Sequence, residues 1–293
     1  MLGRQSGILS RVRRTGVIED ARGLGLHDHV CWAYDDLNDF RCRAREFLAE
    51  GLELGQQVWY VAPGDVETLA DDLRDLDGMA LALQVGAARV VSVESAYPAG
   101  TVVEPAAQAQ AFVTAAMQAR MLGFSGLRVA ADTTPLVRTR GQLEAFARYE
   151  CVVDRCIASH PLSGMCAYNR QELGEEVIAQ LACLHPNING STAQFRLHAS
   201  NHAAASLNGE LDMTTVELLS LALQRADLQP DGGEVVIDAA GLTFIDHRAL
   251  LMLADRTRRT HATVVLQTDW PGAAPLVECL DIKEVRVEPP GWR

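Results

Sequence analysis

The sequence predicts an α/β protein in which a parallel β-sheet with helices on both faces is followed by a second, smaller α/β domain. From about residue 28, segments of strand composition alternate with segments of helical periodicity, which is the pattern of β-α-β units. The strand segments are continuous apolar runs, as a sheet covered on both faces requires. A polar stretch at residues 186–194 interrupts the alternation, which then starts again.

The elements of the first domain follow from their periodicity. In the first helix, Phe40, Ala44 and Phe47 recur at helical spacing, and Gly55 is a typical residue for a helix end. We predict strands at 29–34, 57–64, 88–95, 127–132 and 164–168. We predict helices at 37–55, 66–76, 104–123, 142–160 and 174–185.

The second domain needs roughly 100 residues for a compact core. We predict strands at 195–200, at 203–211 with a bend at Asn208-Gly209, at 233–246 with a loop inside, and at 263–268. We predict helices at 214–228, 249–260 and 274–282. The resulting division is a flexible amino-terminal tail (1–23), a first domain (24–190) and a second domain (194–290).

The composition of the chain limits which partners and which cellular compartment we expect. The 26 basic and 38 acidic residues give a net charge of -12, which argues against nucleic acid and anionic membrane as partners. The 7 cysteines are scattered without a Cys-x-x-Cys pair, as in proteins whose thiols stay reduced. No apolar run approaches the ~18 residues of a membrane span. We therefore expect a cytoplasmic protein.

The sequence lacks the features of a nucleotide hydrolase. A phosphate-binding loop needs a lysine that reaches the β- and γ-phosphates, and Lys283, in the second domain, is the only lysine of the chain. The tract Gly51–Gly55 lies near a predicted helix end rather than at a strand-to-helix turn. We therefore expect a protein that is not an enzyme, name no cofactor and assign no metal site.

One short motif, His27-x-His29-x-Cys31, carries potential ligands. If it is extended, the three side chains share one face of a strand. One interpretation is a hydrogen-bonded histidine beside a buried thiol. The other is contact with a ligand or a metal, because imidazole and thiolate suit soft metals.

Several segments of the first domain together resemble the MEDS (DcmR-like sensory) family. They are HVCWAY at 29–34, FLAEGL at 47–52, QVWYV at 57–61, LRVAAD at 127–132, YE at 149–150, CAYNR at 166–170 and HP at 185–186. The resemblance covers about residues 24–190. It implies a RecA/KaiC-like fold without a phosphate loop and a role in sensing small molecules.

By position, this resemblance implies a pocket formed by His29, Asp132, Glu150 and Tyr168, to which the motif above adds Cys31. Open α/β sheets bind ligands at strand ends, where we expect these residues to lie. Each also has a structural alternative. Asp132 could cap a turn, Glu150 could lie on a solvated helix face, and Tyr168 could be a packed aromatic residue.

The second domain resembles a STAS domain, the fold of bacterial anti-sigma-factor antagonists. The residues that carry this resemblance are GELD at 209–212, VVID at 235–238 and LTFID at 242–246. The family implies a phosphorylated serine directly after the last aspartate, but His247 stands there. Asp212, Asp246 and His247 are thus the candidate residues of a degenerate switch. It is either a constitutive docking surface or a site where the charge of His247 acts. We expect Thr243 to be packed.

We therefore expect a signalling regulator in which a small, unidentified ligand binds the first domain. The second domain would relay the signal to a protein partner, with an anti-sigma factor as the expected partner. The alternative is a metal- or nucleotide-dependent enzyme of RecA-like fold that uses the His27/His29/Cys31 strand. A scaffold is a third interpretation, since STAS domains often associate with one another and a homo-oligomer would follow.

Overall fold

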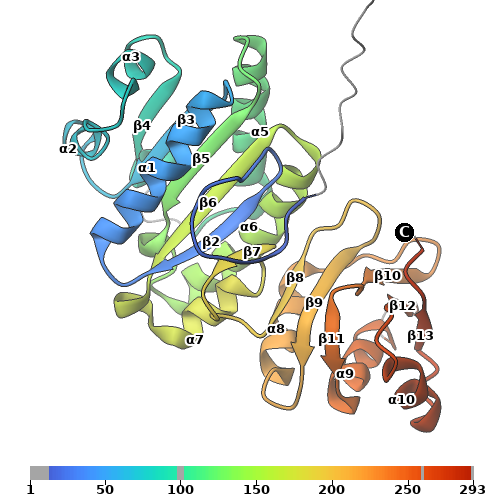
Figure 1. Cartoon of the computed structure of the whole chain (residues 1–293). Helices are drawn as coiled ribbons and strands as arrows, with labels where there is room; N and C mark the ends of the chain where they lie inside the picture. Colours follow the sequence, from blue (N-terminus) through green and yellow to red (C-terminus); the bar gives the residue numbers. More distant parts are fainter. Residues whose placement is uncertain (1–12, 98–101, 259–260, 292–293) are drawn as a thin grey trace, which may run out of the picture.

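The computed structural model describes residues 13–97, 102–258 and 261–291, and within them two β-sheets lie side by side (Figure 1). In these residues the amino-terminal sheet has seven strands in the order β1-β7-β2-β6-β5-β3-β4, and every pair is parallel. The strands are β1 (Gly16–Ile18), β2 (His29–Tyr34), β3 (Gln57–Ala62), β4 (Ala88–Ser92), β5 (Leu127–Asp132), β6 (Leu162–Asn169) and β7 (Asn187–Asn189). The predicted parallel sheet is confirmed.

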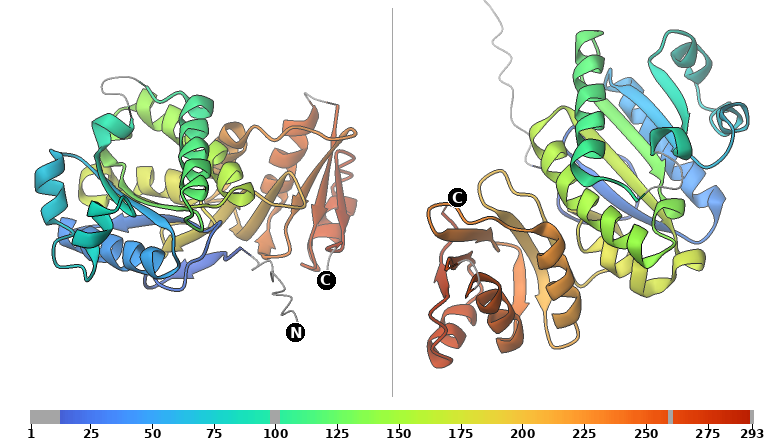
Figure 2. Two further views of the ribbon diagram at one scale, coloured as in Figure 1. Left: turned by 90° about the horizontal axis from the view of Figure 1, so that it is seen from above. Right: turned by 180° about the vertical axis from the view of Figure 1, so that it is seen from behind.

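Helices cover both faces of this sheet. One face packs against α1 (Leu37–Glu53), α2 (Val66–Asp71) and α3 (Met79–Gln84). The other face packs against α4 (Val93–Ala96), α5 (Pro105–Met121), α6 (Arg140–Ser159) and α7 (Arg170–Ala182), and a 3-10 turn, η1 (Thr134–Leu136), follows β5. The view from behind shows the green α5 and the yellow-green α6 over the face opposite to α1 (Figure 2).

Two helices illustrate how the sequence encodes these layers. Asp36 caps helix α1: its side chain accepts a hydrogen bond from the backbone N–H of Asn38, and the helix buries an apolar stripe. Helix α6 begins with a capping box between Thr139 and Gln142. Its buried stripe also contains two carboxylates, Glu150 and Asp154, spaced by one helical turn.

Two short strands of the first sheet lie in segments that we did not predict to be strands. Residues 1–12 of the predicted flexible tail (1–23) lie outside the described residues. Strand β1, which also lies in that predicted tail, joins the sheet by parallel pairing with β7. Strand β7 lies within the polar stretch 186–194 and inside the predicted first domain (24–190). Asn187 and Ile188 are buried there and pair with both β1 and β2. Short strands with polar residues give a weak periodic signal, which is why both escaped prediction.

The second sheet is mixed. Along its main path the order is β11-β9-β10-β12-β13 with parallel pairs, and β8 pairs antiparallel with β9. Its strands are β8 (Phe195–His198), β9 (Ala205–Leu211), β10 (Glu234–Asp238), β11 (Leu242–Ile245), β12 (Thr263–Gln267) and β13 (Val285–Glu288). Its helices are α8 (Val216–Ala226), α9 (His247–Arg258) and α10 (Ala273–Cys279).

Several details differ from the predicted elements. The segment 233–246 forms two strands, β10 and β11, and both α3 and β13 were missed. Gly209 lies within β9 at a φ of 96°, which glycine tolerates. Residues 259–260 of the helix predicted at 249–260 lie outside the described residues. Thr243, which we expected to be packed, is exposed and donates a hydrogen bond to the carbonyl of Gly209.

The two sheets share one apolar core. A single cluster of buried residues runs from the face of the first sheet beneath α6 into the second domain, through residues such as Leu181, Leu197 and Leu219. Polar contacts reinforce this junction. Arg225 of α8 contacts Glu144 of α6 at 3.0 Å (Nε to Oε2). The second domain is therefore packed against the first rather than tethered to it.

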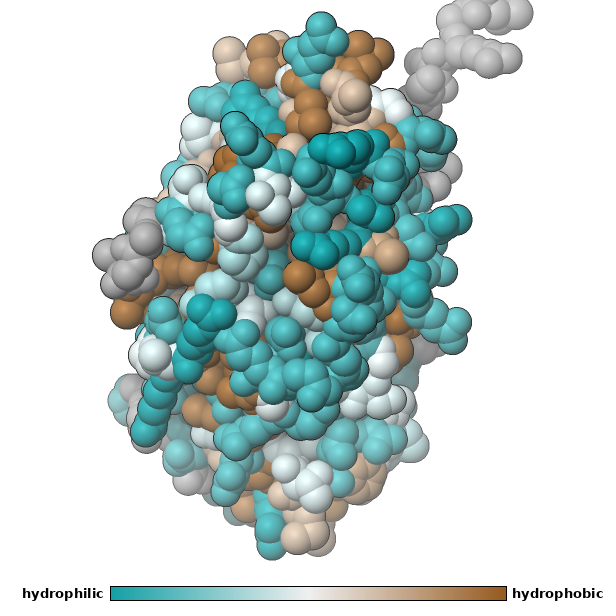
Figure 3. Space-filling view, turned by 90° about the vertical axis from the view of Figure 1, so that its left-hand side faces the viewer, coloured by the Kyte–Doolittle hydropathy of each residue, from teal (hydrophilic) through white to brown (hydrophobic). Residues whose placement is uncertain are grey.

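On the face shown in Figure 3, hydrophilic residues predominate and hydrophobic residues form small separate patches. Among the described residues, no helix combines the length and the apolar character needed to cross a bilayer.

Candidate functional site

Four ligand-type side chains from four segments meet beneath α6. His29 is the first residue of β2, Glu150 lies on α6, Cys166 lies on β6, and His185 follows α7. One donor atom of each lies within 4.8 Å of the other three. All four side chains are buried. We call these residues the four-donor cluster.

Sheet register explains how the strands supply two of these residues. Strands β2 and β6 are parallel neighbours in which Cys31 pairs with Cys166 and His29 pairs with Gly164. Because residues two apart share a face, His29, Cys31 and Cys166 all face α6. Cys166 Sγ lies 3.5 Å from His29 Nε2 and 3.5 Å from Glu150 Oε2.

Both histidines of the cluster are oriented by groups behind them. His29 Nδ1 donates to Asp154 Oδ1 at 2.9 Å, and His185 Nδ1 donates to the carbonyl oxygen of Leu181 at 2.9 Å. A neutral imidazole that donates from Nδ1 carries a lone pair on Nε2. Both Nε2 atoms face Glu150 Oε2, at 3.3 Å from His29 and 3.5 Å from His185.

Burial and neighbouring charges shift the pKa of these groups in different directions. Burial alone would raise the pKa of Glu150, but the adjacent His185 and His29 lower it well below its ordinary value. Burial lowers the pKa of His29, yet the neighbouring carboxylates of Asp154 and Glu150 raise it overall. Burial and then Glu150 raise the pKa of the Cys166 thiol. The cluster therefore favours a cation, either a proton or a metal ion, next to Glu150.

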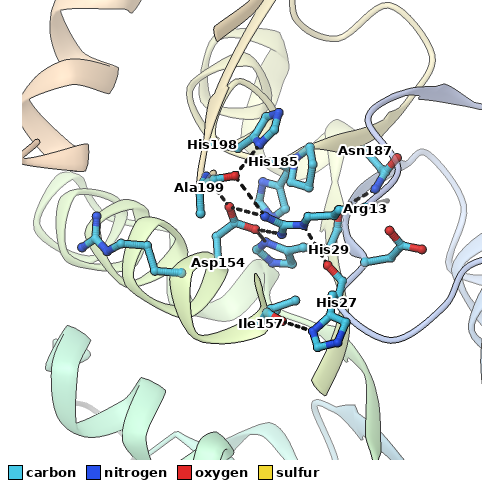
Figure 4. A network of polar contacts seen from close by, with 12 residues as sticks. Arg13, His27, His29, Asp154, Ile157, His185, Asn187, His198 and Ala199 are labelled. Atoms are coloured by element: carbon cyan, nitrogen blue, oxygen red, sulfur yellow. Dashed lines mark hydrogen bonds and ion pairs between the residues drawn. The ribbon is translucent and has the colours of Figure 1, made fainter. Parts of the chain in front are cut away.

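A second layer links this cluster to the rest of the chain through Asp154 (Figure 4). Arg13 makes a bidentate ion pair with Asp154 and donates from Nε to the carbonyl of His27 at 2.8 Å. Asp154 Oδ2 also accepts from the backbone N–H of Ala199 at 2.7 Å, directly after β8. Burial would raise the pKa of Asp154, but Arg13 and His29 lower it strongly.

A small cavity borders the cluster on its apolar side. Its volume is ≈ 30 Å³, which is room for about two waters. Among the described residues, the buried Ser163 Oγ in its wall has no hydrogen-bond partner. The other lining residues are mostly apolar and aromatic: Tyr97, Phe112, Val129, Ala131, Tyr149, Val153, Ile157, Leu162, Met165, together with His29, Gly164 and Cys166.

Three of the five predicted pocket residues come into contact. The hydroxyl of Tyr168 donates to Glu150 Oε1, and Glu150 Oε2 faces His29. Burial and then Glu150 raise the pKa of Tyr168 well above its ordinary value. Cys31 is buried on the same face, but it lies outside the four-donor cluster. Glu150 is fully buried, so the solvated-helix alternative is wrong for that residue.

Asp132 does not belong to this group. It accepts a hydrogen bond from the hydroxyl of Tyr34 at 3.0 Å and one from the backbone N–H of Thr134 at 3.1 Å. Tyr34 and Ala130 pack on the α1 face, and Asp132 shares that face because it lies two residues after Ala130. Asp132 therefore lies on the opposite face of the sheet from His29, Glu150 and Tyr168, and it caps the turn that follows β5, as its structural alternative predicts. Burial raises the pKa of Asp132.

His27 also departs from its predicted place. It precedes β2, has a φ of 74°, and its Nδ1 donates to the carbonyl of Ile157 at 2.8 Å. The predicted strand face of His27, His29 and Cys31 is therefore not formed. The donors that accompany His29 come instead from α6, β6 and the segment after α7.

The candidate residues of the second domain lie together at the ends of two paired strands. Leu211 pairs with Ile245, so Asp212 and Asp246 follow neighbouring strand ends. Asp246 Oδ1 accepts from the backbone N–H of Ala249 at 2.9 Å, which confirms it as the cap of α9. His247 is exposed at the first position of that helix.

Sequence reasoning missed Arg13, Asp154, Cys166 and His185 as parts of the site. One local signal existed, because Glu150 and Asp154 are spaced by four residues on the apolar face of an amphipathic helix. A buried carboxylate pair needs cationic or hydrogen-bonding partners. The partners of Glu150 lie far from it in the chain: His29 is 121 residues away, Cys166 is 16 and His185 is 35. Arg13, the partner of Asp154, is 141 residues away.

Comparison with protein families matches residues 28–186 to MEDS, described as the MEthanogen/methylotroph, DcmR Sensory domain. The chain belongs to this family. The match contains the whole four-donor cluster and ends directly after His185. Comparison with curated proteins finds no match.

Proposed function

We propose that this chain is a non-catalytic, cytoplasmic signalling regulator in which the MEDS domain binds a small molecule and the second domain passes the result to a protein partner. In this proposal the first sheet is a RecA-like sheet without a phosphate loop. The second domain is a STAS domain, and an anti-sigma factor is its partner. Membership of a sensory family supports the sensing role.

The observation that carries the proposal is the position of Asp154. One of its oxygens binds His29 in the four-donor cluster, and the other binds the backbone of Ala199 in the second domain. Arg13 holds both oxygens and also lies 3.4 Å from the carbonyl of Ala199. A ligand that moves His29 would therefore act on Asp154 and, through it, on the segment that follows β8.

The cavity supplies a place for such a ligand. Its walls are apolar and aromatic, with Ser163, His29 and Cys166 as the polar groups. This composition suits a molecule of very few heavy atoms with one polar group. Binding transmits a signal only if the ligand favours one arrangement of the two domains over another.

The output face would lie around Asp212, Asp246 and His247. Two exposed apolar side chains adjoin these residues, Met213 and Phe244, which are 64% and 41% exposed. Because His247 occupies the position at which STAS antagonists carry their phosphorylated serine, phosphorylation of a serine at this position cannot control the face. Either the face docks constitutively or the charge of His247 modulates docking.

Calorimetric titration tests the relay. An anti-sigma factor would be titrated into the full chain with and without small alcohols and aldehydes as ligands. A ligand that binds should change the affinity for the partner by 5-fold or more, a typical coupling of about 1 kcal/mol. The substitution Arg155→Ala removes the bond from Arg155 to the carbonyl of Ala226 at the domain junction, so ligand binding should persist while coupling falls. Unchanged partner affinity with every ligand that binds would reject the relay.

A further inference from the structure

The geometry points to a zinc site: we propose that His29 Nε2, Glu150 Oε2, Cys166 Sγ and His185 Nε2 bind one Zn²⁺ ion. The proposal concerns metal binding alone and does not depend on the relay or on the STAS assignment. Two imidazoles, a carboxylate and a thiolate form a ligand set that suits zinc in tetrahedral coordination.

The distances between donor atoms match a tetrahedron of zinc ligands. With metal–ligand bonds of 2.0–2.3 Å, the edges of such a tetrahedron are about 3.3–3.8 Å long. Four of the six edges are 3.3 Å (His29 to Glu150), 3.5 Å (His29 to Cys166), 3.5 Å (Cys166 to Glu150) and 3.5 Å (His185 to Glu150). All six lie within 4.8 Å.

The tautomers leave the correct atoms free for a metal. Because Nδ1 of His29 and Nδ1 of His185 donate to Asp154 and to the carbonyl of Leu181, both Nε2 lone pairs point into the cluster. Among the described residues, the buried Nε2 of His185 has no hydrogen-bond partner. Carboxylate and carbonyl acceptors behind the ligating histidines are the usual outer layer of zinc sites.

Charge balance supports a divalent ion. Asp154 is neutralised by Arg13 in a buried ion pair. Glu150 contributes one negative charge, and Cys166 contributes a second when its thiol loses its proton to solvent as the S–Zn bond forms. A Zn²⁺ ion at the centre therefore leaves the buried cluster neutral, as an apolar interior requires.

The site would have a structural consequence. Its ligands come from β2, α6, β6 and the segment after α7, so one ion would fasten the centre of the sheet to two covering helices. The fourth coordination position is filled by protein, which is typical of structural zinc. The adjoining cavity brings a small molecule next to His29 and Cys166 without requiring it to bind the metal.

Metal analysis of the full chain tests the proposal. The exposed thiols would first be removed by Cys42→Ser and Cys279→Ser, and purification would avoid a histidine tag. We expect one zinc per chain by elemental analysis. X-ray absorption at the zinc edge should show one sulfur at about 2.3 Å and three nitrogen or oxygen atoms at about 2.0–2.1 Å. This measurement needs no substitution at the site and is not affected by misfolded variants.

Cobalt distinguishes the four-donor cluster from the local motif. After removal of zinc by a chelator, Co²⁺ should give a thiolate-to-cobalt charge-transfer band. Cys166→Ser should abolish the band, and His185→Ala should weaken Co²⁺ binding by at least 10-fold. Cys31→Ser and His27→Ala are the matched controls, since they alter a second thiol on the same face of the sheet and a second nearby imidazole, and both should retain the band.

Three results would overturn the proposal. The first is substoichiometric zinc together with no uptake of Zn²⁺ or Co²⁺ by folded, metal-free protein. The second is a zinc absorption spectrum without a sulfur ligand. The third is a band that survives Cys166→Ser in folded protein but disappears in Cys31→Ser, which would move the site to the local motif.

Discussion

Arg128 and Glu150 are both fully buried charged side chains on opposite sides of the same sheet, yet their partners differ. On the α1 side, the guanidinium of Arg128 donates to four oxygens, which belong to Leu24, Phe47, Glu50 and Gln56. It also lies over the ring of Phe47 at 4.5 Å. Donors and acceptors are matched there, so the network is complete without a further ligand.

On the α6 side, acceptors face one another. The carboxylate of Glu150 and two imidazole Nε2 atoms converge, and among the described residues one of those nitrogens has no hydrogen-bond partner. Burial of a charge therefore does not by itself mark a site. An excess of acceptors does, because something cationic must join them.

The largest effect should come from the matched network. Arg128→Ala leaves four oxygens without their donor and opens a cavity, so the free energy of unfolding should fall by about 3–5 kcal/mol. Urea denaturation measures this loss. Arg74→Ala, which breaks an exposed ion pair with Asp71, should change it by less than about 0.5 kcal/mol.

The Arg128→Ala variant also shows whether the two faces of the sheet are independent. Folded Arg128→Ala should still gain stability from zinc by the same amount as the parent chain, about 2.7 kcal/mol at a hundredfold excess of zinc over the Kd. Loss of that gain would show that the two faces are not independent.

A second effect concerns His198, a buried histidine in which both ring nitrogens have hydrogen-bond partners. His198 donates from Nδ1 to the carbonyl of Ala199, and its Nε2 accepts from Asn208 at 3.0 Å. Burial is the main cause that lowers its pKa to about 4. The charge of Asp154 partly opposes this shift, and the charges of Arg13 and Arg196 add to it. Between about pH 6.5 and 4 the unfolded chain takes up a proton that the folded chain excludes, so stability falls as the pH falls.

The resulting loss in the free energy of unfolding amounts to about 3 kcal/mol, and this loss is complete below about pH 4. Urea unfolding at several pH values should show a loss on acidification that is smaller by this amount in His198→Gln than in the parent chain. Identical pH profiles for the two proteins would contradict the assignment of His198 as a buried neutral histidine.

The smallest effect tests how closely α1 is packed over Arg128. A Cβ at Gly51 would lie 2.8 Å from Arg128 Cδ and 2.8 Å from Val58 Cγ1, so Gly51→Ala should cost about 1–3 kcal/mol. Gly141 in α6 is the control, because a Cβ there meets nothing within 4 Å. Gly141→Ala should stabilise the chain by up to about 1 kcal/mol, which thermal unfolding can measure.

Much of the fold follows from sequence periodicity. The strand at 127–132 was predicted to the residue, and Asp246 was predicted as the cap of α9. Periodicity failed for β7 and β13, because three- or four-residue strands hold too few apolar positions to show a pattern. It also missed β1, since polar residues surround that strand and only its pairing with β7 makes it part of the sheet.

Apolar runs and family motifs are local properties of the chain, so the sequence alone predicts the parallel sheet and points to His29, Glu150 and Tyr168 as candidate site residues. The face of the sheet that each residue occupies follows from strand register in the folded chain. Strand register placed Asp132 on the side of Tyr34 and Cys166 on the side of His29. Register depends on contacts between residues far apart in the chain, so no local pattern contains it.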